Sequence, residues 1–248
     1  MRIWIFLLCL IPCFSQAQII NTERLRVGAK EQGWTGTASL SANLVQNVRK
    51  STRLGLLTGV EYLRKPHRML LLGQYKLNSI DGSVGQNQGY GHLRYNRDIG
   101  KRWIVESFGQ LQFNAVQLLR LRGLTGAGMR FRLAENDTFS CFVGSLYMFE
   151  YEELNDGLGA IHRDHRQSSY FSLGFRLSDQ ARIDHVSYWQ PKWEQVSDFR
   201  FSTETRLQVN ITKKLALRTV FYLLYDSRPP DGLPLTYYTW SNSLTVSL

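Results

Sequence analysis

The stretch that decides the fold is "FRFSTETRLQVNITKKLALRTVFYLLYD", residues 199–226. Before the Thr212-Lys213-Lys214 segment, apolar residues and threonines occupy the odd positions, and mostly charged or polar residues occupy the even positions. A period of two is the signature of a β-strand with two unlike faces. The alternation resumes at Leu215, so the stretch predicts a hairpin that turns at the lysine pair. Both strands are much longer than the roughly five to six residues usual in globular proteins.

The same alternation recurs along the whole chain. It predicts about twelve strands, at 33–47, 51–63, 68–77, 87–98, 102–113, 116–133, 137–151, 167–178, 180–190, 198–211, 214–226 and 237–248. Every second connection is short and polar, whereas most of the others are longer, as at 78–87 and 152–166. Short turns on one side and longer loops on the other are typical of outer-membrane barrels.

The apolar faces of these strands need a cover. The chain contains no second set of elements that would bury twelve such faces, so lipid is the simplest cover. Aromatic residues also collect near the strand ends, where they would form two interfacial girdles. The sequence therefore predicts an all-β protein, a single transmembrane antiparallel β-barrel of about twelve strands in up-and-down order. A soluble β-protein with ordinary core aromatics is the alternative.

The N-terminus indicates secretion. Residues 1–17 combine a basic start, a short apolar run and a small residue at Ala17, which predicts a cleaved signal peptide followed by a barrel domain over 18–248. We therefore expect the protein in the cell outer membrane of a Gram-negative envelope. The formal charge is +10, but the arginines are spread among the strands, so we expect no nucleic-acid partner. Cys141 is the only cysteine after the signal peptide, which excludes an internal disulfide.

Several longer segments resemble a known family. They are "RLRGLTGAGMRFRL" (120–133), "GSLYMFEYEE" (144–153), "SDFRFSTETRLQVNITKKLALR" (197–218), "YDSRPPDGLP" (225–234) and the chain end "WSNSLTVSL" (240–248). Together they are similar to the outer-membrane proteins of domain of unknown function 481, which include the salt-induced outer-membrane protein type. The resemblance covers nearly all of the chain after the signal peptide. It implies a small outer-membrane barrel without an established activity, so it supplies no functional residues.

The face predicted to line the lumen is rich in arginine. It comprises Arg120, Arg122, Arg130, Arg132, Arg176, Arg200, Arg206 and Arg218, with the acids Glu106, Glu150, Glu152 and Glu204. A wall of guanidinium groups would favour anionic solutes, because each grips a carboxylate or phosphate at two points. The alternative is a ladder of ion pairs that fills a closed bore. About twelve strands lie between the filled eight-stranded barrels and the open sixteen-stranded ones.

Two other clusters suggest chemistry. His162, Asp164 and His165 are weak candidates for a metal site. A solvated loop, or a loop that meets lipopolysaccharide through Arg163 and Arg166, is the simpler interpretation. His92 would face inward. A serine and histidine pair would make an interfacial lipid hydrolase, but no motif connects His92 to an inward serine such as Ser140.

The final strand carries an assembly signal. Trp240, Leu244, Val246 and Leu248 share one face, as the barrel-assembly machinery requires, although outer-membrane barrels usually end in an aromatic residue. We expect membrane lipids and lipopolysaccharide as further partners, and we expect no cofactor, no metal and no enzymatic activity. The sequence does not specify an oligomeric state. The predicted role is structural support of the envelope or a narrow, porin-like passage for small solutes, and the lipid-modifying hydrolase is the alternative.

Overall fold

The structure is a computed structural model that describes residues 32–155, 157, 159–212 and 215–246, the side chains of 245 and 246 excepted. Four predictions concern positions outside these residues. They are the signal peptide over 1–17, the turn at Lys213-Lys214, the side chain of Val246 and the terminal Leu248.

Twelve strands make up almost all of the described chain, which confirms the predicted all-β class. They are β1 (Gly33–Gln46), β2 (Lys50–Arg64), β3 (His67–Ile80), β4 (Ser83–Asp98), β5 (Trp103–Asn114), β6 (Leu119–Glu135), β7 (Phe139–Leu154), β8 (Ile161–Arg176), β9 (Ala181–Pro191), β10 (Phe199–Asn210), β11 (Leu215–Asp226) and β12 (Thr236–Val246). A short 3-10 helix, η2 (Ala115–Gln117), joins β5 to β6.

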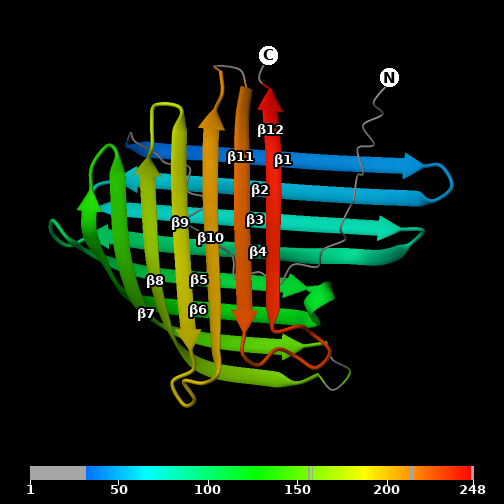
Figure 1. Cartoon of the computed structure of the whole chain (residues 1–248). Coiled ribbons are helices and arrows are strands. Elements are labelled where there is room, and N and C mark those ends of the chain that lie inside the picture. Colours follow the sequence, from blue (N-terminus) through cyan, green and yellow to red (C-terminus); the bar gives the residue numbers. More distant parts are fainter. Residues whose placement is uncertain (1–31, 156, 158, 213–214, 247–248) are drawn as a thin grey trace, which may run out of the picture.

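The strands form one antiparallel sheet in up-and-down order. Each strand pairs with the next along the chain, from β1 to β12. The sheet coils strongly, so that β8–β12 run across the direction of β1–β4 in the view of Figure 1. β1 and β12 are its two edges, and the strand pairs of the described residues do not include one between them.

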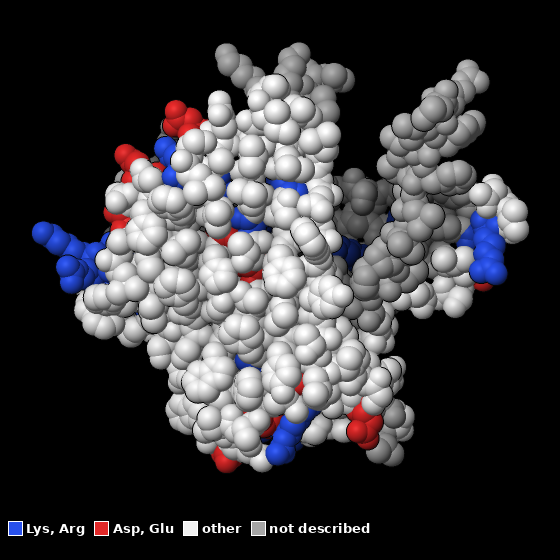
Figure 2. All heavy atoms as spheres, in the orientation of Figure 1, with Lys and Arg blue, Asp and Glu red and all other residues white. Residues whose placement is uncertain are grey.

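Burial in this sheet is the reverse of that in a soluble protein. The largest fully buried side chains include Glu61, Glu106, Glu150, Arg130 and Arg166. Large apolar side chains are exposed on the opposite face of the strands, for example Leu71, Leu93, Leu111, Phe171 and Leu244. Figure 2 shows one side of the molecule as a broad uncharged surface with charged groups mostly toward its borders. Such a surface suits a lipid environment.

No helix within the described ranges is both long enough and apolar enough to cross a membrane.

Two predicted loops are wrong, because the strands that they join are longer than expected. β3 and β4 extend to a turn of two residues, Asp81 and Gly82, with φ of 51° and 79°. Asp-Gly with both φ values positive is the sequence of a tight hairpin turn whose twist matches the strands. The loop predicted over 152–166 shrinks to 155–160, because β7 continues to Leu154 and β8 starts at Ile161.

Candidate functional site

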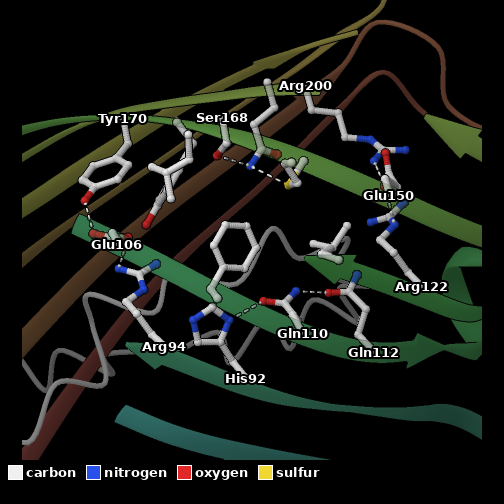
Figure 3. Close-up of a pocket in the computed structure, with 16 residues that line it drawn as sticks. His92, Arg94, Glu106, Gln110, Gln112, Arg122, Glu150, Ser168, Tyr170 and Arg200 are labelled. Carbon is white, nitrogen blue, oxygen red and sulfur yellow. Dashed lines mark hydrogen bonds and ion pairs between the residues drawn. The ribbon is translucent and has the colours of Figure 1, made fainter. Parts of the chain in front are cut away.

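A pocket lies on the inner face of the coiled sheet. Its lining comes from strands β4 to β10, and its unfilled space is about 580 Å³ when the part open to solvent is included. Polar and charged side chains dominate the lining, with Glu106, Arg122, Glu150, Tyr170 and Arg200 at the centre of its chemistry (Figure 3). The strand alternation causes this arrangement, since every second residue of each strand points inward.

Glu150 is the centre of a buried charge cluster. Its carboxylate contacts three guanidinium groups, with Arg122 Nε at 3.1 Å, Arg166 Nε at 2.6 Å and Arg200 as the third partner. The arginines come from β6, β8 and β10, and the carboxylate itself has no exposed surface. Glu150 therefore connects strands that are not neighbours in the sheet.

Further carboxylates neutralise the same arginines. Glu152 accepts from Arg122 Nε at 2.7 Å and from Arg200 Nη2 at 3.1 Å. Asp226 accepts from Arg200 Nε at 2.8 Å. On the other side, Arg166 donates to an oxygen of Asp198 at 3.2 Å. Three arginines thus meet four carboxylates, and the charges compensate one another within the cluster.

A second buried group lies around Glu106. It accepts a hydrogen bond of 2.7 Å from the Tyr170 hydroxyl and lies 3.3 Å from Arg94 Nη1. Because Glu106 belongs to β5 and Tyr170 to β8, this bond spans the interior of the coiled sheet. The Arg130 guanidinium stacks over the Phe142 ring, 3.8 Å from its centroid. A cation over an aromatic face is a stabilising contact.

An apolar cluster lies among these charged groups. Leu146, Tyr170, Val186 and Tyr188 pack together and are joined by Phe108. Gly144 makes room for the Tyr170 ring, because a Cβ atom at this glycine would overlap the ring. Side chains from β5, β7, β8 and β9 therefore meet in the interior of the coiled sheet.

The predicted arginine wall is spread over several environments. Arg122 and Arg200 line the pocket, and Arg130 is buried next to it. Arg206 pairs with Glu204 at 3.7 Å. The remaining side chains lie toward the strand ends, with Arg132 in contact with Asp98 and Glu135, Arg176 half-buried and Arg218 exposed.

The prediction for Arg120 is wrong. Its side chain is 68% exposed and pairs with Glu153 at 2.8 Å, outside the pocket. The register of β6 with β7 shifts between Leu119 and Leu121, so Leu119 takes the inward position and is 2% exposed. One residue of slip reverses the faces of a strand, and sequence periodicity does not reveal it.

Sequence reasoning missed two buried arginines. The sequence predicts Arg166 in an external loop, but the residue lies in β8 and its side chain is 2% exposed. Arg94 lies two positions from His92 on β4 and is buried on the same inner face. The alternation along this strand is therefore the sequence signal that would have predicted its inward position. Arg163, in contrast, is exposed, with its guanidinium over the Tyr151 ring.

The candidate metal ligands do not come together. His162, Asp164 and His165 lie on β8, where alternation puts His165 on the opposite face from the other two. Asp164 binds Lys192 Nζ at 3.0 Å. Burial would lower the pKa of Lys192, but hydrogen bonds to Asp164 and Asp198 outweigh it, so this pKa is raised. Within the described ranges, no three metal-binding side chains form a group.

His92 contacts an amide. Its Nδ1 lies 2.9 Å from Gln110 Oε1, and its ring stacks on Phe108. An amide cannot act as the nucleophile that an ester hydrolase needs. Ser140 lies at the start of β7, three strands away from β4.

The predicted assembly signal lies on the last strand. Trp240 and Leu244 share the outer face of β12 and are 71% and 61% exposed. The backbone of Val246 pairs with Leu215.

One family profile and several solved porin structures match the chain. A family profile described as "Protein of unknown function, DUF481" matches residues 37–248. No curated protein matches the chain. Among solved structures, the chain is similar to the NanC porin, with 12% identity, a TM-score of 0.48, and coverage of 87% of this chain and 98% of that porin. The chain is also similar to the KdgM porin in complex with disordered oligogalacturonate, with 11% identity, a TM-score of 0.43, and coverage of 87% of this chain and 99% of that porin. A third similar structure is OccK11 (OpdR) of Pseudomonas aeruginosa, with 9% identity, a TM-score of 0.40, and coverage of 86% of each chain.

Proposed function

This chain belongs to the DUF481 family of proteins of unknown function, so its role is inferred from its own residues. We propose that it is an outer-membrane barrel that provides a narrow passage for small solutes. The observation that carries the proposal is a polar, charge-lined pocket enclosed by strands whose opposite face is apolar. A protein that only filled its interior to support the envelope would gain little from so many buried charges, since each is costly to desolvate.

The outer surface supports the membrane part of the proposal. Exposed apolar residues alternate with buried polar ones along the strands, as on β5, where Leu111 is 61% exposed and Gln110 and Gln112 are buried. A closed strand arrangement satisfies the backbone in lipid, and alternation adapts its two faces to lipid and water. In this proposal, the C-terminal strand presents Trp240 and Leu244 to the assembly machinery.

The charge cluster determines the kind of solute. The arginines around Glu150 would attract anions if they were unpaired. Four carboxylates already accept their hydrogen bonds. We therefore propose a passage in which size is the main criterion and the preference for anions over cations is weak.

Channel recordings with two leucine variants test the passage. Leu146 is 2% exposed in the apolar cluster that crosses the interior, whereas Leu111 is exposed on the outer face. We expect Leu146→Ala to raise the single-channel conductance of the refolded protein in a planar bilayer, because it removes atoms from the lining of the pocket. Leu111→Ala, a truncation of the same size, leaves the conductance unchanged. A heat-modifiability gel checks that both variants fold.

A silent bilayer with well-folded wild-type protein and well-folded Leu146→Ala would contradict the passage. The interior would then be a filled ion-paired core, and the structural role would replace the proposed one. We expect a reversal potential near zero in a salt gradient, because the passage discriminates weakly between anions and cations. Strong anion selectivity would contradict the proposal that the carboxylates neutralise the arginines.

A further inference from the structure

Three side chains on the outer face of β9 and β10 form a continuous hydrogen-bonded chain. Ser187 Oγ lies 3.0 Å from His185 Nε2 and donates to Thr203 Oγ1 at 2.9 Å. His185 Nδ1 lies 2.8 Å from Thr205 Oγ1. A hydroxyl, an imidazole and a second group that orients the imidazole are the parts of an activated serine nucleophile. Neither His92 nor the charge cluster takes part in this arrangement.

The strand register holds these residues together. His185 and Ser187 are two positions apart on β9, so both point to the same face, while Val186 and Tyr188 are buried on the other. Thr205 lies directly opposite His185 on β10. Opposite residues of an antiparallel pair bring their Cβ atoms within about 4.5–5.5 Å. Rigid strands thus position all three groups.

The surroundings of the triad are apolar and open to lipid. Phe171 and Trp189 flank it and are 39% and 43% exposed. Ser187 lies two residues from Trp189 toward the middle of β9, and tryptophan side chains collect at the membrane interface. Lipid that covers the outer face of the sheet would therefore contact these side chains. An ionisable side chain on a membrane-embedded surface is costly to keep, and such residues often serve a function.

We propose that Ser187, His185 and Thr205 form an interfacial site that cleaves acyl esters of membrane lipids. This activity goes beyond the solute passage and does not rest on it, because the triad lies on the opposite face of the sheet. Ser187 is the nucleophile and His185 the general base, and both are the proposed catalytic residues. Thr205 is a positioning residue that accepts a hydrogen bond from His185 Nδ1–H, so that Nε2 accepts from Ser187 when the serine hydroxyl rotates away from Thr203.

The reaction needs water as the only co-reactant. Ser187 Oγ attacks the ester carbonyl, and its proton passes to His185 Nε2. The ester C–O bond breaks, the alcohol leaves with that proton, and an acyl-serine remains. A water molecule then gives a proton to His185 and attacks the acyl carbonyl. The bond between the acyl group and Ser187 Oγ breaks, the fatty acid leaves, and the proton passes from His185 to Ser187 Oγ. Nothing is oxidised or reduced in either step.

An active-site-directed probe tests the site directly. We use an alkyl fluorophosphonate carrying a fluorophore on the full, refolded protein in detergent micelles, and peptide mass spectrometry locates the label. We expect covalent labelling at Ser187, loss of labelling in Ser187→Ala, and a drop of about 100-fold or more in His185→Gln, the usual contribution of a general base. Release of fatty acid from phospholipid in mixed micelles follows the same order.

Matched variants separate catalysis from folding. Ser169→Ala removes an exposed-face serine of β8 that contacts Gln167 rather than a histidine, and its labelling equals that of the wild type. Thr205→Val lowers the labelling rate, and Thr205→Ser restores it because only the hydroxyl is needed to orient His185. A purely structural threonine would show no such rescue.

Two results would overturn the proposal. One is a folded wild-type protein, confirmed by its heat-modifiable gel band, that shows no labelling at Ser187. The other is labelling that persists in Ser187→Ala. Channel recordings on Ser187→Ala show the wild-type conductance, so failure of the hydrolase and failure of the passage remain distinguishable.

Discussion

Glu150→Ala lowers the free energy of unfolding by about 3–5 kcal/mol, the usual cost of removing one partner from a buried ion pair. The substitution leaves the guanidinium groups of Arg122, Arg166 and Arg200 without their shared partner, in a region where Glu150 has no exposed surface. Urea titration in detergent micelles, followed by the heat-modifiable gel band, measures the change.

An exposed ion pair serves as the control. Glu135 pairs with Arg132 at 2.7 Å, but its side chain is 49% exposed. Solvent screens such a pair, so Glu135→Ala costs less than about 1 kcal/mol. If both variants unfolded at the same urea concentration, the cluster around Glu150 would not contribute to stability, and its description as a buried network would be wrong.

Gly144→Ala is also strongly destabilising, by about 2–6 kcal/mol from two effects. The added methyl group overlaps the Tyr170 ring, and overpacking in a tight interior costs about 1–3 kcal/mol. When the ring moves, Glu106 loses the hydroxyl that donates to it at 2.7 Å. A buried acceptor left without its donor adds about 1–3 kcal/mol. The same urea titration measures this loss.

A second glycine and a double variant provide the controls for Gly144. Gly109 lies in β5, and an added Cβ atom would meet nothing within 4 Å. We expect Gly109→Ala to change stability by at most about 0.5 kcal/mol. In a Tyr170→Ala background, Gly144→Ala loses most of its effect, because the ring that it would strike is gone. Additive effects of the two substitutions would refute the contact as the cause.

The strands and their two faces follow from the amino-acid sequence alone. The alternation in 199–226 requires only neighbouring residues, so it predicts β10 and β11 and the side on which Arg200 and Glu204 lie. The same local rule predicts twelve strands and an apolar outer face, because lipid and water demand opposite side chains at alternate positions. It also indicates the inward parity of Glu106 and Glu150.

Only the tertiary structure decided which of these side chains meet. A register shift at Leu119 turns Arg120 outward, and the extension of β8 brings Arg166 to Glu150. Both depend on pairing with a strand distant in sequence, which periodicity does not encode. For the same reason, Ser187, His185 and Thr205 look like three ordinary polar residues until the register of β9 and β10 puts them in contact.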